Sequence, residues 1–472
     1  MASRKDLLDS YQFAARRVVS AAVVHETDPT EWPYRRLGGA GMGAVMITVI
    51  ALAVAGIYGM IRPGGKTSWR DGSSVILVKE TGATYVYLDG KLHLTPNFTS
   101  AALLAGTTTK VSTSTKSLAE VPRGPELGIA DAPANLPVAA DLVAPPWSFC
   151  TQQVWDTSNS ELSRSWMLVG ERPDAGTEIA DAGLLVRTPS GTLWLIWQNM
   201  RFEIPDEGAA RSALNLGNQV IVPVGEAWLE ALPVGRPIAP IVVPRAGQAS
   251  KALPKARIGQ VRKVTSSSGT QYFLTLASRL SPITELQASL QNGAGAAVKK
   301  ATPADVSAAG QTALRTATDP PAQAPDFVAL RDSKTVACAS WENGEFVPKI
   351  SVESEVPVDS GLNSALQTAT VSANGTSLAD RVWVEPGKAT LVQSRPSPES
   401  TSGPLYLVTD QGIRYAVPSD AVLSSLGLSG QESWSLPAAV IARIPEGPAL
   451  DPQVALAALH AQEEIKDMLS GG

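Results

Sequence analysis

The longest run of apolar residues in the chain extends from Leu37 to Ile61 and contains no charged residue. It is bounded by Arg35 and Arg36 on one side and by Arg62 on the other. A helix of this length spans ~37 Å, enough to cross the ~30 Å hydrocarbon core of a bilayer. A cleaved signal peptide would begin near residue 1, whereas 36 residues precede this run. The pattern therefore predicts a permanent transmembrane helix over 37–61.

The tail before the anchor, residues 1–36, has the spacing of an amphipathic helix. Ser3 and Asp6 are placed as a capping box at its start, and Pro29 and Pro33 prevent it from continuing into the anchor. An isolated helix of this length needs a surface to cover its apolar face. Its nearly balanced charge favours a partner protein over lipid headgroups, and a frayed, solvated tail is the alternative.

Small residues recur within the predicted membrane helix itself. Ala51, Ala55 and Gly59 are spaced by four, and Gly39 and Gly43 form a GxxxG pattern. Small residues let helices approach closely in lipid, so this stripe is a candidate helix-packing face.

Strand-like segments, each followed by a helix-like segment, recur four times after the anchor. The clearest copies, 183–238 and 403–454, share the pattern Arg-aromatic-x-aliphatic-Pro, at 201–205 and 414–418. Weaker copies occupy 74–106 and 259–291. Their agreement predicts an internal duplication in which each repeat is a small hairpin plus a helix.

The segments between the repeats, 107–182 and 327–402, each hold one cysteine with a tryptophan three residues away. We expect them to form one central β-rich domain joined by a Cys150–Cys338 disulfide, although two unrelated buried thiols remain the alternative. The predicted fold class is α+β, with an elongated, pseudo-twofold outer domain. Residues 292–326 are rich in Ala, Gly, Thr and Pro, which predicts a flexible linker. A shorter linker is predicted over 393–403, and a C-terminal tail over 455–472.

Composition and the placement of the cysteines indicate which partners and which cellular compartment the sequence favours. The net charge is −5 and the isoelectric point is about 5.5, so no basic surface suggests nucleic acid. Basic residues flank the anchor on both sides and do not decide its orientation. Both cysteines follow the anchor, which favours a cytoplasmic tail and an extracytoplasmic outer domain.

Candidate catalytic or metal-binding groups are few. The three histidines, His25, His93 and His460, are divided by the membrane. Gly65-Lys66-Thr67 resembles the end of a phosphate loop, but Gly59 is one residue too far upstream for GxxxxGK[ST]. We therefore expect no catalytic residue, no metal and no cofactor, and a structural protein rather than an enzyme.

Two arginines hold equivalent places in the clearest repeats. Arg201 and Arg414 each precede an aromatic residue, Phe202 or Tyr415. Because side chains alternate along a strand, we expect the aromatic rings to be buried and both arginines to point outward. They are then either solvated or available to contact a neighbouring protomer.

The tail contains the motif Tyr11-Gln12-Phe13-Ala14-Ala15-Arg16-Arg17. It is similar to the Tyr-x-Phe-x-x-Arg-Arg signature of EccB, and the chain resembles this single-pass membrane component of actinobacterial type VII (ESX) secretion systems. The resemblance continues, in order, over nearly the whole chain. Further matching segments are Arg62-Pro63, 97–101, 122–125, 127–129, 147–150, 412–418 and 447–452.

The resemblance implies a non-enzymatic subunit of the plasma-membrane secretion complex. Its implied partners are EccC, EccD, EccE, the mycosin protease and other copies of the chain. It also implies that Tyr11, Phe13, Arg16 and Arg17 dock the tail within the complex, and that the repeats resemble a cell-wall-binding fold. A peptidoglycan-binding anchor and a nucleotide hydrolase, as the family is sometimes described, are the alternatives.

Overall fold

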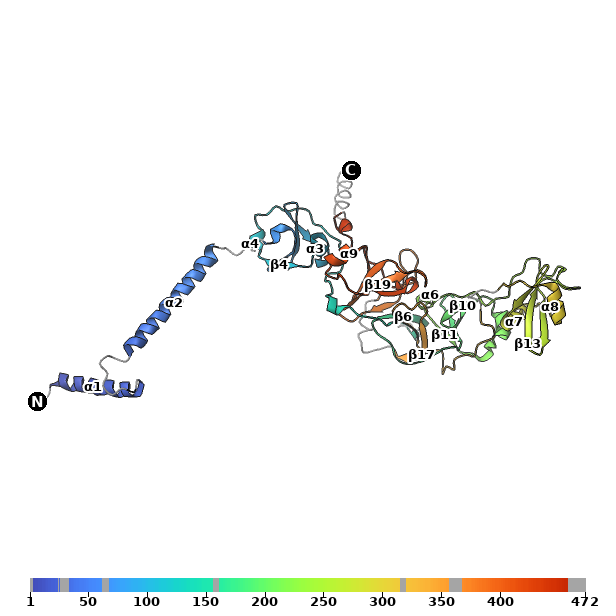
Figure 1. Ribbon diagram of the computed structural model, residues 1–472, viewed down its shortest axis with the longest axis horizontal. Coiled ribbons are helices and arrows are strands. Elements are labelled where there is room, and N and C mark those ends of the chain that lie inside the picture. Colours follow the sequence, from blue (N-terminus) through green and yellow to red (C-terminus); the bar gives the residue numbers. More distant parts are fainter. Residues whose placement is uncertain are drawn as a thin grey trace.

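One long apolar helix separates a short helical tail from the rest of the molecule in this computed structural model (Figure 1). The tail helix α1 spans Arg4–Val23, and the apolar helix α2 spans Tyr34–Ile61. The structure describes residues 3–23, 25, 34–61, 68–155, 161–314, 320–355 and 367–456. Residues 68–456 form an elongated outer domain (Figure 1).

Both N-terminal helices begin where local chemistry requires. The Ser3 backbone N–H donates to Asp6 Oδ2 at 2.9 Å, and the Asp6 N–H donates to Ser3 Oγ at 3.3 Å, which is the expected capping box. Helix α2 begins directly after Pro33 and contains a stretch, Gly38–Tyr58, with a mean hydropathy of 2.3, long and apolar enough to cross a membrane. It starts three residues before the predicted boundary, because Arg35 and Arg36 can extend the helix beyond the hydrocarbon core.

Four repeats in the outer domain share one topology. In each, three antiparallel strands are followed by a helix and by a fourth strand that pairs in parallel with the first. Repeat 1 contains β1 (Val75–Val78), β2 (Thr84–Leu88), β3 (Lys91–Thr95), α3 (Phe98–Ala105), β4 (Lys110–Thr113) and α4 (Thr115–Leu118). Repeat 2 contains β8 (Leu184–Arg187), β9 (Leu193–Trp197), β10 (Met200–Ile204), α5 (Glu207–Ala213), β11 (Ile221–Pro223) and α6 (Glu226–Ala231).

The other two repeats follow the same order. Repeat 3 contains β12 (Val261–Ser266), β13 (Gly269–Thr275), β14 (Leu280–Ile283), α7 (Glu285–Gly293), β15 (Val298–Lys300) and α8 (Pro303–Ala309). Repeat 4 contains β19 (Ala389–Arg395), β20 (Leu405–Thr409), β21 (Arg414–Val417), α9 (Asp420–Ser425), β22 (Trp434–Pro437) and α10 (Ala438–Ile441). Three short 3₁₀ helices, η1 (Ser68–Asp71), η2 (Ala139–Asp141) and η3 (Leu216–Asn218), complete the helical elements described.

The repeats are therefore larger than the hairpin-plus-helix units expected, and three boundaries move. Repeat 1 extends beyond residue 106, because β4 pairs in parallel with β1. The first part of the predicted linker 292–326 belongs to repeat 3, because β15 pairs with β12 and a Thr302–Asp305 capping box starts α8. Repeat 4 begins at Ala389 and not at 403, because β19 supplies its first strand and includes part of the expected linker 393–403. Small and polar residues in these segments concealed strand pairing that only the neighbouring strands stabilise.

The central domain is a six-stranded sheet to which both inter-repeat segments contribute. The first segment supplies β5 (Trp147–Trp155), β6 (Glu161–Val169) and β7 (Asp174–Glu178). The second supplies β16 (Ala337–Trp341), β17 (Lys349–Glu355) and β18 (Arg381–Trp383). The order β18-β6-β5-β16-β17-β7 shows that each half gives its third strand to the other half. This exchange interlocks the halves about a pseudo-twofold axis near β5 and β16.

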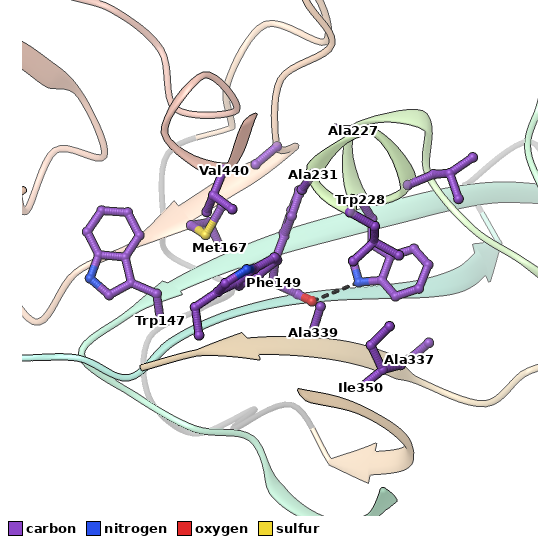
Figure 2. Close-up of a cluster of buried hydrophobic side chains, with 14 of the residues drawn as sticks. Trp147, Phe149, Met167, Ala227, Trp228, Ala231, Ala337, Ala339, Ile350 and Val440 are labelled. Atoms are coloured by element: carbon purple, nitrogen blue, oxygen red, sulfur yellow. Dashed lines mark hydrogen bonds between the residues drawn. The ribbon is translucent and has the colours of Figure 1, made fainter. Parts of the chain in front are cut away.

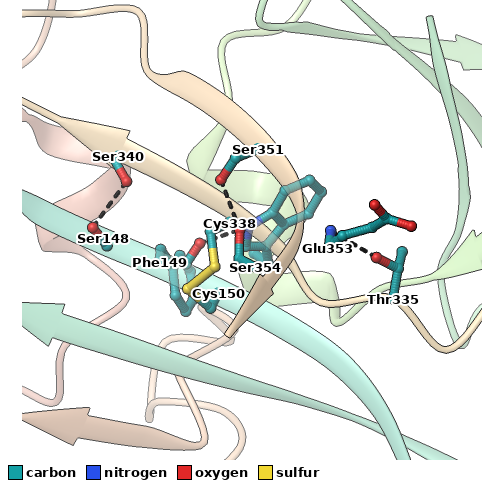
Figure 3. Close-up of a disulfide and its surroundings, with 10 residues drawn as sticks. Ser148, Phe149, Cys150, Thr335, Cys338, Ser340, Ser351, Glu353 and Ser354 are labelled. Atoms are coloured by element: carbon teal, nitrogen blue, oxygen red, sulfur yellow. Dashed lines mark hydrogen bonds between the residues drawn. A yellow bond between two sulfur atoms is a disulfide. The ribbon is translucent and has the colours of Figure 1, made fainter. Parts of the chain in front are cut away.

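The disulfide lies at the centre of this sheet. Cys150 on β5 is directly opposite Cys338 on β16, and their sulfur atoms are bonded (Figure 3). Two residues away, the Ser148 and Ser340 hydroxyls form a hydrogen bond of 2.8 Å (Figure 3). The disulfide joins residues 188 positions apart and so cross-links the two halves of the chain.

A large core on one side of the central sheet joins it to repeats 2 and 4. It includes the fully buried Trp147, Phe149 and Trp228 (Figure 2). Trp341 is fully buried in the same core. The Trp228 indole N–H on α6 donates to the Phe149 carbonyl on β5 at 2.8 Å, which satisfies a buried polar group (Figure 2). The repeats also pack in pairs, α5 on α7 and α3 on α9. Each pair contains one repeat from each half, as pseudo-twofold symmetry requires.

Candidate functional site

The tail helix presents the side chains expected to dock it. Tyr11 is 74% exposed, Phe13 is also exposed, and the Arg17 guanidinium carbon lies 5.8 Å from the centre of the Phe13 ring. Arg16 is exposed on the same helix. Large apolar side chains in the tail, including Leu7 and Leu8, are likewise exposed. The helix thus has an apolar surface that the described part of this chain leaves uncovered.

The small-residue stripe on α2 is also open. Ala51 and Ala55 are exposed, and no heavy atom lies within 4 Å of a Cβ placed on Gly39 or Gly43. Gly59 lies in the last turns of α2, and its surroundings are outside the described residues. The described stripe can therefore accept another helix without rearrangement of this chain.

The Arg414 side chain does not point into solvent, as was expected from the sequence, but is covered by other parts of repeat 4. Tyr415 is buried as expected, but the Arg414 side chain on the opposite face is only 12% exposed. Its guanidinium lies over the Tyr406 ring at 4.8 Å, its Nε donates to the Ile444 carbonyl at 2.9 Å, and its Nη2 pairs with Glu446 at 2.7 Å. Tyr415 and Arg414 lie on opposite faces of β21, as strand alternation predicts. The face that carries Arg414 is also covered, so Arg414 makes its contacts within repeat 4.

Arg201 occupies the same position in repeat 2 with a poorer set of partners. Phe202 is buried, and the Arg201 guanidinium lies over the Trp194 ring at 5.3 Å. Val234 stands where repeat 4 has Glu446, and the Arg201 Nε has no hydrogen-bond partner within the described chain. Burial lowers the pKa of Arg201, and the field of Glu230 opposes that effect. This residue, too, is not directed outward.

A glycine beneath the buried aromatic residue is a feature that sequence reasoning missed. The third strand of repeats 1, 2 and 4 pairs in parallel with a Pro-x-Gly segment, at 122–124, 233–235 and 445–447. A Cβ on Gly124, Gly235 or Gly447 would overlap the ring of His93, Phe202 or Tyr415 respectively. In repeat 3, Ser281 stands in place of the aromatic residue and Thr312 in place of the glycine. The recurrence of Pro-x-Gly was the signal available in the sequence.

An ion pair connects repeats 2 and 4 directly. Arg443, at the end of α10, bonds Glu230 of α6 and also donates to the Ser377 carbonyl at 2.9 Å. Burial lowers the pKa of Arg443, and the charge of Glu230 opposes this. These residues are 213 positions apart, so nothing in the local sequence indicates the contact.

The groups considered for metal binding or nucleotide chemistry are placed as follows. Among them no group of three or more His, Cys, Asp and Glu side chains could hold a metal ion. His93 is buried, with Nδ1 2.8 Å from the Pro125 carbonyl. Gly65-Lys66-Thr67 and His460 lie outside the described residues.

Comparison with known sequences agrees with this architecture. The family described as "Type VII secretion system ESX-1, transport TM domain B" matches residues 1–462. The chain belongs to the EccB family of type VII secretion proteins. The Mycolicibacterium smegmatis protein named "ESX-3 secretion system ATPase EccB3" is 29% identical over 96% of this chain and 90% of that relative. The Mycobacterium tuberculosis protein named "ESX-2 secretion system ATPase EccB2" is 30% identical over 88% of each chain.

Solved structures show the same fold. A chain of an intact ESX-5 inner membrane complex has a TM-score of 0.58 at 24% identity, covering 97% of this chain and 95% of that one. A chain of the EccB3 dimer from the ESX-3 core complex has a TM-score of 0.56 at 25% identity, covering 81% of this chain and 99% of that one. The α+β outer domain is therefore that of EccB proteins.

Proposed function

We propose that this EccB protein is a structural subunit of a type VII secretion complex in the plasma membrane, serving protein export. The observation that supports this most is the family match over residues 1–462, which includes the tail, the membrane helix and the outer domain. Titles of similar structures name an inner membrane complex and an EccB dimer, which supports ESX partners and self-association.

In this proposal the tail is cytoplasmic and the outer domain is extracytoplasmic. The buried disulfide supports that orientation, because disulfides persist in oxidising compartments. The exposed residues Tyr11, Phe13, Arg16 and Arg17 dock α1 onto the components EccC, EccD and EccE. Ala51, Ala55 and Gly59 pack α2 against a neighbouring membrane helix, and the mycosin protease associates with the assembled complex.

Purification through an affinity tag on the tail tests the proposal. Membranes are extracted in mild detergent, and the proteins that remain bound are identified by mass spectrometry. We expect other ESX membrane components and untagged copies of this chain. Recovery of the chain alone, from membranes that contain an assembled complex, would contradict a structural role.

A peptidoglycan-binding anchor is a second candidate function, supported by a hollow of about 1040 Å³ between repeats 2 and 3. Trp197 and Tyr272 line it together with hydroxyl and amide side chains, a lining that suits sugars. Sedimentation with purified cell wall tests this candidate. Retention in the pellet that Trp197→Ala abolishes would support it, and equal retention of both proteins would contradict it.

Nucleotide hydrolysis is a third candidate, because both relatives described above carry "ATPase" in their names. Gly65-Lys66-Thr67 is the segment to test. Phosphate release that Lys66→Ala abolishes in the purified full chain would support hydrolysis. Release that Lys66→Ala leaves unchanged would assign the activity to a contaminant or another site.

A further inference from the structure

Repeat 3 is strongly basic within an acidic protein. Residues 239–314 contain nine Arg and Lys residues against two carboxylates, Glu285 and Asp305, a formal charge of +7. The whole chain has a net charge of −5, so the remainder carries −12. The average over the whole chain therefore conceals a strongly basic segment.

Most of this charge is exposed and without counter-charge. The exposed cations are Arg245, Lys251, Lys255, Arg257, Arg279, Lys299 and Lys300. In the described part of the chain, none of them forms a salt bridge with a carboxylate. Like charges gathered in this way repel one another and destabilise the folded repeat, so a complementary anionic surface would relieve that repulsion.

An apolar hollow opens beside one of these cations, Arg245. It has a volume of about 300 Å³, and its lining includes Ile241, Val243, Leu276 and Leu314. Val242 also lines it and is 93% exposed, more than any other large apolar residue described. A fully exposed valine next to an apolar hollow favours burial against another surface.

Hydrogen bonds join the segments that carry Lys251 and Arg279 to residues that line the hollow, and join Arg257 to the segment that carries Arg245. The Lys251 N–H donates to the carbonyl of Ala277, which lines the hollow, at 2.8 Å. The Leu276 N–H donates to the Arg279 carbonyl at 2.9 Å and closes the turn that carries Arg279. The Arg257 guanidinium donates to the Gly247 carbonyl at 2.8 Å, two residues from Arg245. The rim is therefore ordered by the fold.

We propose that this hollow and its basic rim form a docking surface for an acidic protein segment that carries an aliphatic side chain. An apolar centre with a charged rim is the usual anatomy of a protein interface, and the charge selects an acidic partner. A purely anionic polymer would use the cations but leave Val242 and the hollow exposed. The bilayer is a poorer fit, because repeat 3 lies at the end of the outer domain opposite repeat 1, to which α2 leads (Figure 1).

This inference goes beyond a structural role in the membrane complex and does not depend on docking of the tail. It is tested with the full chain in native membranes, with the photo-reactive residue p-benzoylphenylalanine placed at Val242. Membranes are irradiated in about 50 mM and about 500 mM NaCl, and the cross-linked peptides are sequenced by mass spectrometry. We expect an aliphatic residue within an Asp- and Glu-rich protein segment, and a lower yield at high salt.

Charge reversal provides the decisive comparison. Arg245→Glu with Lys251→Glu should lower the cross-link yield by roughly five-fold or more, because attraction becomes repulsion. Lys91→Glu with Lys116→Glu, exposed cations of repeat 1, is the matched control and should leave the yield unchanged. The same photo-reactive residue at Val138, exposed and distant from repeat 3, sets the background.

Four results would overturn the proposal. The first is a cross-link yield at Val242 no higher than at Val138, and the second is a cross-link to a neutral or basic segment. The third is a cross-link only to lipid, to glycan or to a second copy of this chain. The fourth is a cross-link yield that charge reversal does not change. Limited proteolysis of the charge-reversed protein, with the fragments identified by mass spectrometry, confirms that repeat 3, which contains no tryptophan, remains folded.

Discussion

Gly447 and Gly235 lie at positions where packing leaves no room for a side chain. Each lies against an aromatic ring of the preceding strand, where a Cβ has no space. Gly447→Ala should therefore lower the free energy of unfolding by about 1–3 kcal/mol through overpacking. Urea unfolding of the full chain in detergent, followed by tryptophan fluorescence, measures the change. Gly217→Ala is the control, because a Cβ there meets no neighbouring atom, and equal effects of the two substitutions would contradict the packing account.

A substitution beside Arg201 is expected to stabilise the folded protein. Arg414, the counterpart of Arg201, pairs with Glu446, whereas Arg201 is next to Val234, which is 58% exposed. Val234→Glu should supply the missing carboxylate and raise the free energy of unfolding by about 1 kcal/mol or less, since one partner stays near the surface. Val234→Gln, which adds the same length without charge, is the control. A glutamine variant as stable as the glutamate variant would show that charge pairing is not the cause.

At the scale of single elements, α1 is a helix whose large apolar side chains are exposed, among them Leu7, Leu8, Tyr11, Phe13, Val18 and Val23. Its capping box stabilises the helix locally, but the apolar side chains around Tyr11 and Phe13 have nothing to cover them in the described chain. Such a helix contributes little to the stability of the outer domain, from which α2 separates it (Figure 1). We therefore expect α1 to contribute through assembly of the complex.

Deletion of residues 3–24 should therefore release the protein from its complex and leave the outer domain intact. We expect loss of co-purifying ESX components, together with an unchanged thermal unfolding transition of the outer domain. Tyr11→Ala with Phe13→Ala should have the same effect in a protein of full length. Retention of every component after the deletion would remove the docking role proposed for α1.

At the scale of the whole molecule, the outer domain is two interlocked halves. Each half gives its third central strand to the other, and repeats pair across the halves through α5 with α7 and α3 with α9. The Cys150–Cys338 bond joins the halves at the centre of this arrangement, where both residues are fully buried. Stability of one half therefore depends on the presence of the other.

Removal of the disulfide should destabilise the whole outer domain in one transition. Cys150→Ala with Cys338→Ala should lower the free energy of unfolding by about 2–5 kcal/mol, because a loop of this length loses its restraint in the unfolded chain. Unfolding is measured without reductant for both proteins. A variant in which the central sheet unfolds while repeats 1 and 3 retain their own separate transition would contradict the interlocked arrangement.

The local sequence was sufficient to determine the membrane helix, the tail helix, the repeated pattern and the burial of Phe202 and Tyr415. In each case a short-range physical rule decides the outcome: hydrophobic length for α2, helical spacing and capping for α1, and strand alternation for the aromatic residues. The pairing of Cys150 with Cys338 was also predictable, because the outer domain contains only two cysteines.

Tertiary structure alone decided the environment of Arg201 and Arg414, the Arg443–Glu230 pair and the boundaries of repeats 3 and 4. Alternation assigns a side chain to one face of a strand, but whether that face meets water depends on segments far along the chain, such as 444–446 for Arg414. The strand β15 likewise has little intrinsic preference and becomes a strand because β12 pairs with it. Residues that interact across about 200 positions leave no periodic signal, so only the folded chain reveals them.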